Sequence, residues 1–185
     1  EEGEAALRRL ARHPATARRL ATRLAQWFVA DTPPPALVER LTQRYLDTGG
    51  DIAAVLRTLI DAPETWAPSH TLFKTPLDYA CSALAAVGGA GDERQALLAG
   101  RFLQAAGQPL LAWPTPDGYP TLASSWLSPE ALAQRADLAL SLGRQLAAPD
   151  SLAPWIAPAR WARIRQEPVA LQAGLALASP DFMRK

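Results

Sequence analysis

Few residues of this chain stand in a pattern that could carry out chemistry. The sequence of 185 residues contains no G-x-x-x-x-G-K, H-E-x-x-H or G-x-S-x-G segment, the patterns that hold phosphates, a zinc ion or a serine nucleophile. With two histidines and one cysteine, the chain cannot supply the four Cys and His ligands of a structural zinc site. The sequence therefore predicts no metal and no cofactor, and it does not favour an enzyme.

Three single residues still have chemical potential. His13 could carry a proton, but it directly precedes Pro14, and we favour a boundary residue that orients the helix starting there. Lys74 precedes the cap residue Thr75, so its amine could meet a carboxylate or bind an anion, although a surface lysine is the plainer interpretation. Cys81 shares an apolar face with Leu77 and Leu84 in the next helix, and we expect a buried small hydrophobe there.

A proline-rich segment at residues 107–128 is the best candidate for a binding site. It brings three large rings, Trp113, Tyr119 and Trp126, close in sequence to Asp117, and loops of this length in compact domains tend to be functional or mobile. The alternative is that the tryptophans anchor the loop to the core. Since three rings exceed what anchoring requires, we expect at least one of them to be partly accessible.

Charge excludes one class of partner and leaves another open. Lys and Arg number 19 and Asp and Glu number 18, so no global field favours nucleic acid. Six arginines nevertheless lie within the first 23 residues: Arg8, Arg9, Arg12, Arg18, Arg19 and Arg23. They form either a solvated helical face or a basic surface for phosphate or an acidic partner.

Composition and periodicity predict the elements that position these residues. Ala and Leu, at 38 and 28, far outnumber Val and Ile, at 9 together, which favours helix over sheet. We predict an all-α chain: one domain over residues 1–185, an irregular orthogonal bundle of about seven to nine helices with two long proline-rich loops, 107–128 and 149–168. We expect only one short helix in the second loop, containing Trp161 and Ile164. No apolar run is long enough to cross a bilayer.

Apolar spacing also predicts the buried faces. Leu7 and Leu10 share a face of a helix at 3–12. In the helix that begins at Pro14, the predicted core face contains Ala17, Leu20, Ala21, Leu24, Trp27 and Phe28. In the helix capped by Asp51, we expect a buried face made of Ile52, Val55, Leu56, Leu59 and Ile60, with Leu56 in its middle.

A series of short motifs follows in a fixed order along the chain. They are residues 10–17 (LARHPATA), 27–29 (WFV), 31–38 (DTPPPALV), 50–52 (GDI), 55–57 (VLR), 73–76 (FKTP), 107–109 (GQP), 117–119 (DGY), Trp126 and 177–182 (LASPDF). In this series the chain resembles the C-terminal half of a bacterial family catalogued as domain of unknown function DUF1800. The resemblance implies an all-helical bacterial protein without an established activity, whose relatives are usually longer. The family's association with exported, sulfatase-like proteins favours the cell envelope over the cytoplasm.

Two functional interpretations remain open at this point. The first is a non-catalytic interaction or accessory module, whose tryptophan-bearing loops meet a partner chain or the family's N-terminal half. The alternative is an enzyme or small-ligand-binding domain of cell-envelope metabolism, with the 107–128 loop as its pocket and help from Lys74 or His13. A shared pocket would favour the second interpretation, and an exposed apolar patch would favour the first.

Overall fold

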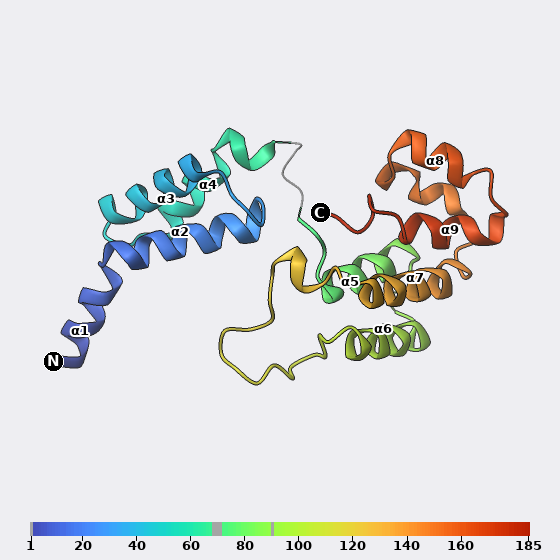
Figure 1. Ribbon diagram of the computed structural model, residues 1–185, viewed down its shortest axis with the longest axis horizontal. Helices are drawn as coiled ribbons and strands as arrows, with labels where there is room; N and C mark the ends of the chain where they lie inside the picture. The colour runs from blue at the N-terminus through green and yellow to red at the C-terminus, as the bar shows by residue number, and fades with distance from the viewer. Residues whose placement is uncertain (1, 68–71, 90) are drawn as a thin grey trace. The chain divides into compact units, whose positions relative to one another are not determined.

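The chain is helical throughout, as its composition predicts. A computed structural model describes residues 2–67, 72–89 and 91–185, and in these ranges it contains nine α-helices, three short 3₁₀ helices and one isolated β-bridge, between Phe73 and Arg184 (Figure 1). Within the same ranges, no helix is both long and apolar enough to span a bilayer. The all-α prediction is confirmed.

The contacts of the chain group into two compact units, Glu1–Leu72 and Phe73–Lys185, which we call unit 1 and unit 2. Each has its own cluster of buried apolar side chains. A single domain over residues 1–185 therefore stays a prediction, which the unfolding of separate fragments would test.

Unit 1 is built from four α-helices and a 3₁₀ helix. In chain order they are α1 (Glu2–Ala11), α2 (Pro14–Phe28), α3 (Pro35–Asp47), α4 (Ile52–Ile60) and η1 (Pro63–Trp66). The cap predicted at Asp51 is in place, since its side chain accepts a hydrogen bond from the Ala54 N–H at the start of α4. The core forms where α2 meets α3 and α3 meets α4.

Alanines, rather than large apolar side chains, form the buried face of α2. Ala17, Ala21 and Ala25 are fully buried, and they recur every four residues along the side that packs on α3. The predicted face is confirmed for Ala17 and Ala21, and Leu20 and Leu24 are partly buried against the same cluster. The prediction is wrong for Trp27 and Phe28, because both are exposed. Small side chains let two helices approach closely, so the packed row is the alanine row and the larger side chains beside it stay outside.

The prediction for α1 is wrong, because no residue of α1 is buried and Leu7 and Leu10 are exposed. The prediction for α4 is right in part. Val55 and Leu59 of the predicted face are buried and Leu56 is half-buried, whereas Ile52 and Ile60 are exposed.

Unit 2 contains five α-helices and two 3₁₀ helices among its described residues. In chain order they are α5 (Pro76–Ala86), α6 (Glu93–Ala105), η2 (Ala123–Ser125), α7 (Pro129–Gly143), η3 (Pro149–Trp155), α8 (Pro158–Ile164) and α9 (Val169–Leu177). The second proline-rich stretch thus includes a 3₁₀ helix as well as the expected short helix, in which Trp161 and Ile164 are buried. Prolines at the first turns of η3 and α8 suit helix starts, where a missing N–H costs nothing.

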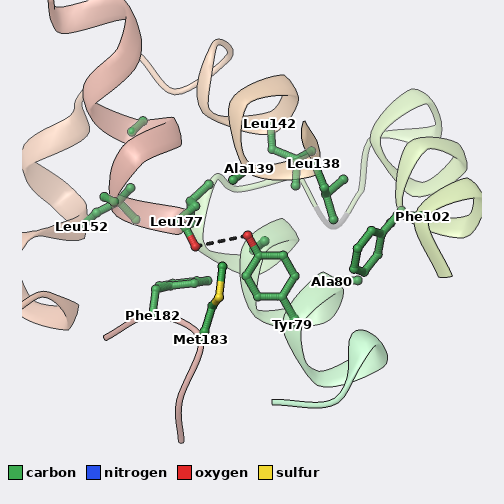
Figure 2. Packing of buried hydrophobic residues seen from close by; sticks show 14 of the residues in the cluster. Tyr79, Ala80, Phe102, Leu138, Ala139, Leu142, Leu152, Leu177, Phe182 and Met183 are labelled. Atoms are coloured by element: carbon green, nitrogen blue, oxygen red, sulfur yellow. Dashed lines mark hydrogen bonds between the residues drawn. The ribbon is translucent and has the colours of Figure 1, made fainter. Parts of the chain in front are cut away.

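Tyr79 stands at the centre of the unit 2 core (Figure 2). Its ring packs between Phe102 of α6 and Phe182, with centroids 5.9 and 6.1 Å away. Its hydroxyl lies 3.1 Å from the backbone oxygens of Arg135 in α7 and of Leu177 in α9. The buried hydroxyl therefore has hydrogen-bond acceptors within the core. Burial raises the pKa of the Tyr79 hydroxyl, which keeps its proton for this bond.

The face of α5 that carries Tyr79 explains a wrong prediction for Cys81. Cys81 is exposed and Leu77 is largely accessible, whereas Tyr79, Ala80 and Ala83 are buried. A tyrosine can be a core residue when backbone carbonyls meet its hydroxyl, and those carbonyls come from segments far away in the sequence. The helix therefore turns its Tyr and Ala face inward.

Candidate functional site

The 107–128 loop begins where α6 ends and returns to the chain's helices at α7. Gly107, with φ 77°, terminates α6 in the left-handed region that glycine favours. In Figure 1 the loop, coloured yellow-green to yellow, runs out from the end of α6 as a long irregular trace before the turn η2. Most side chains from Leu110 to Gly118 are exposed.

Internal contacts hold this loop in shape. The rings of Trp113 and Tyr119 pack with centroids 4.7 Å apart, and the Tyr119 hydroxyl donates a short hydrogen bond to the Pro109 carbonyl. The Asp117 carboxylate accepts hydrogen bonds from Thr115 Oγ1 and, at 3.1 Å, from Trp113 Nε1. Those two bonds, the one from Thr115 first, lower the pKa of Asp117. The loop therefore braces itself with the side chains that the sequence singles out.

Trp126 anchors the loop at its base. Its ring is 6% exposed within the unit 2 core, and its Nε1 donates to the Pro120 carbonyl at 3.0 Å. Trp113, in contrast, is 37% exposed. The expectation that at least one of the three rings is accessible is confirmed. Trp126 anchors the loop in the core, and Trp113 contributes to the surface.

The outer turn of the loop presents leucines to solvent. The Leu111 side chain is fully exposed. With φ 57°, Leu111 is also the only residue other than glycine that has a left-handed backbone conformation in the described part of the chain. Leu110 beside it is also exposed. A left-handed backbone conformation destabilises a leucine, and exposure of its apolar side chain to water is also unfavourable. Since such features are found at functional positions, Leu111 is a candidate contact residue.

Lys74 lies elsewhere in unit 2, beside the start of α5. Its Nζ stands 4.1 Å above the centre of the Phe182 ring, and its backbone oxygen accepts a 2.8 Å hydrogen bond from Arg135 Nη2. Burial first, and then the charges of Lys185 and Arg135, lower the pKa of the Lys74 amine to about 8 against the attraction of Asp78, which raises it. Asp78 itself pairs with Lys185 at 2.7 Å.

Arg135 is the residue of this cluster that sequence reasoning missed. It is 1% exposed, its guanidinium lies 4.5 Å from the Phe73 ring centre and 4.9 Å from that of Tyr79, and within the described ranges its Nη1 has no hydrogen-bond acceptor. Burial lowers its pKa to about 10. Nothing in the local pattern of α7 distinguishes this arginine from a solvated one, because Lys74 is 61 residues away.

His13 performs the boundary role favoured by the sequence. Its Nδ1 accepts a 3.1 Å hydrogen bond from the Ala15 N–H and caps α2 in unit 1. Of the predicted site residues, the structure thus brings Trp113, Asp117 and Tyr119 together, with Trp126 at the base of their loop. Lys74 has Phe182 and Arg135 as its neighbours, and His13 belongs to the other unit.

Chemically, the loop offers apolar surface rather than a reaction centre. Asp117 is engaged by Thr115 and Trp113, as described above, and its neighbours contribute rings and leucines. Among the described residues, no group of three His, Cys, Asp or Glu side chains could hold a metal ion. Such a surface suits contact with another chain.

Comparison with known proteins gives a family and no more. No curated protein and no solved structure matches the chain. Its residues 1–184 match the sequence pattern of the family described as protein of unknown function (DUF1800). The motifs from the 10–17 segment to the 177–182 segment fall inside that match, and the chain belongs to the DUF1800 family.

Proposed function

We propose that this protein is a non-catalytic interaction module and that the 107–128 loop docks on a partner protein. The observation that carries the proposal is the outer turn, where Leu110, Leu111 and the accessible part of Trp113 form an apolar surface on a braced loop. Exposed apolar side chains that gather on one element indicate a surface that another molecule covers.

The internal bonds of the loop favour docking energetically. Binding by a flexible loop has to overcome the entropy of ordering it, whereas the Asp117 bonds and the packing of Trp113 on Tyr119 hold this loop in one conformation beforehand. Large rigid rings next to leucines are also the residue types that dominate binding energies in protein interfaces.

The same bonds make the pocket interpretation the weaker one. Asp117 accepts the bonds from Trp113 Nε1 and Thr115 Oγ1 of its own loop through Oδ1, so this carboxylate has a role in bracing the loop that requires no ligand. Lys74 and His13 have their described contacts away from the loop. The alternative of an enzyme or ligand binder therefore has less support than docking.

Photo-crosslinking in the native cell tests this proposal. A benzophenone amino acid replaces Leu111 in one variant and Leu97 in a matched control, since Leu97 is an equally apolar, exposed side chain on α6 of the same unit. We expect a discrete adduct with one protein from position 111 and none from position 97. Equal adducts from both positions, or no protein adduct at position 111, would contradict docking through the loop.

A further inference from the structure

Unit 1 carries a basic face that the proposed function does not use. Residues 5–30 contain six arginines and no Asp or Glu, so the positive charge is concentrated in α1 and α2. One of these arginines, Arg8, pairs with Glu4 at 2.7 Å. The others include Arg19 and Arg23 on an exposed side of α2.

Two parallel rows of side chains run along this side of α2. One row contains Thr16, Leu20 and Leu24, and the other contains Arg19, Arg23 and Trp27, and successive members of each row are four positions apart in the sequence. A furrow of about 490 Å³ is lined by these six residues. Rows of this spacing are the ridges that pack against a second helix.

No described element of unit 1 fills this furrow. The packed side of α2 is the alanine row that faces α3, and the furrow lies beside that row along the same helix. Trp27 of the furrow is 54% exposed, and Leu20 and Leu24, which pack in part against the unit 1 core, are only partly buried. The apolar part of the furrow is thus accessible to another molecule.

The charges beside the furrow also lack acidic partners. Among the described ion pairs, none joins an Asp or Glu to Arg19 or Arg23, and the nearest polar contact is a 3.4 Å bond from Arg23 Nη1 to Gln26 Oε1. Arg40, in α3 of the same unit, shows the alternative, because it pairs with Glu64 at 2.6 Å. Arginines at i and i+4 are spaced to meet carboxylates at i and i+4 of a partner helix.

We infer that the furrow on α2 binds an acidic amphipathic helix of a partner protein. The apolar side of that helix packs against Leu20, Leu24 and Trp27, and glutamates or aspartates on its flank pair with Arg19 and Arg23. A helix fits better than an anionic membrane surface, since a bilayer would contact the arginine row without filling the furrow beside it. This inference is independent of the 107–128 loop, which belongs to unit 2.

A charge exchange between protein and peptide tests the inference. The probe is a three-heptad helical peptide with leucines on one face and glutamates on the flank, and its counterparts carry lysine in place of glutamate or alanine in place of leucine. Fluorescence anisotropy measures each peptide against the full chain and against the double variant Arg19→Glu/Arg23→Glu. We expect the double variant to bind the glutamate peptide at least about tenfold more weakly and to gain affinity for the lysine peptide.

The control variant Arg44→Glu/Arg57→Glu makes the same change of charge on exposed positions of α3 and α4. We expect it to change the affinity for the glutamate peptide by less than about twofold. Three outcomes overturn the inference: an equal loss in this control, equal binding of the peptide that lacks leucines, or binding to anionic phospholipid vesicles but not to the glutamate peptide. A loop variant such as Leu111→Ser leaves peptide binding unchanged, so this inference and the proposed function fail separately.

Discussion

At the scale of single residues, Lys74 has the most unusual electrostatic environment among the described lysines. Its amine is partly withdrawn from water, and two further cations, Arg135 and Lys185, lie near it against one carboxylate, Asp78. The ring of Phe182 below Nζ stabilises the charged form in part, but less than water would. The outcome is a lysine amine whose pKa falls to about 8.

The two lysines of the chain make that pKa directly measurable. Reductive methylation with ¹³C-formaldehyde labels Lys74, Lys185 and the α-amino group, whose ordinary pKa is also about 8. The variants Lys74→Arg and Lys185→Arg each remove one lysine signal and so distinguish both lysines from the α-amino group. We expect the Lys74 signal to titrate with a midpoint near the pKa of about 8, well below the ordinary 10.5. A midpoint near 10.5 would mean that Lys74 is fully solvated and that the cluster with Arg135 does not form.

The same shift predicts how stability depends on pH. Between the folded pKa of about 8 and the unfolded value of 10.5, the unfolded chain holds a proton on Lys74 that the folded chain has released. Unfolding then takes up protons, so this residue makes the free energy of unfolding rise with pH across that window. The variant Lys74→Met keeps the hydrocarbon stem over Phe182, and we expect its denaturant midpoint to lack this rise relative to the natural chain.

Asp117 belongs to the same scale, because it acts through two hydrogen bonds inside its loop. We expect Asp117→Ala to release Trp113 and Thr115 and to speed proteolytic cleavage within residues 109–122. The melting temperature should stay nearly unchanged, since the side chain is fully exposed and touches no core residue. Unchanged cleavage would mean that Trp113 and Tyr119 hold the loop without the carboxylate.

At the scale of elements, the closest packing lies where α7 crosses α9. A Cβ added to Gly143 would stand 2.4 Å from the backbone nitrogen of Gly174, so two glycines allow these backbones to touch. Closely packed helices cannot absorb a methyl group without moving apart. Gly143 is the last residue of α7, and Gly174 lies inside α9, where its cost in helix propensity is offset by that packing.

A pair of glycine substitutions separates packing from propensity. We expect Gly143→Ala to destabilise the protein by about 1 to 3 kcal/mol, because the methyl group meets the α9 backbone. Gly100→Ala in α6 is the control, since open space surrounds that position, and it should stabilise the protein by up to about 1 kcal/mol. Urea denaturation measures both, and equal effects would contradict the contact between α7 and α9.

In α4, one leucine should matter more than its neighbour. Leu59 is 2% exposed in the unit 1 core and Leu56 is half-buried. We expect Leu59→Ala to cost about 2 to 5 kcal/mol, as a buried leucine does, and Leu56→Ala to cost clearly less. A larger loss for Leu56 than for Leu59 in denaturant unfolding would mean that Leu56 is the more deeply buried of the two leucines, as its place in the middle of the predicted face indicates.

These elements show which parts of the fold can be predicted from sequence. Helix starts were predictable because caps are local: Asp51 and the capping box of Thr75 with Asp78 bond within three residues. Buried faces were harder, because the alanine row of α2 and the Tyr79 face of α5 depend on what α3, α7 and α9 bring to them. Apolar spacing alone also included Trp27 and Phe28 in α2 and Ile52 and Ile60 in α4, which are exposed.

The candidate site also has one part that the sequence predicts and one part that it does not. Trp113, Asp117 and Tyr119 lie within seven residues of one another, so their meeting followed from the sequence. The cluster around Lys74 did not, since Arg135 reaches it from α7. Contacts between distant segments leave no periodic signal in a single sequence.

At the scale of the whole molecule, unit 2 closes on itself. Its first and last segments pair, through the bridge of Phe73 with Arg184 and a 2.9 Å hydrogen bond from the Lys74 N–H to the Met183 carbonyl. Phe182 and Met183 then enter the core around Tyr79 (Figure 2). Unit 2 therefore has a complete core and joined ends.

This arrangement predicts that unit 2 folds without unit 1. We expect a fragment of residues 73–185 to show a helical circular dichroism spectrum and a cooperative thermal transition, because its buried cluster contains residues of that range alone. The matched fragment 73–181 lacks Phe182, Met183 and the pairing at residue 184, and it should melt at a lower temperature or stay unfolded.

If 73–185 fails to fold while the full chain unfolds in one transition, residues 1–185 form the single domain that the sequence predicts. If the fragment melts with the same midpoint as one of two transitions of the full chain, the two cores are separate folding units, and the loop and the α2 furrow can be tested on separate fragments.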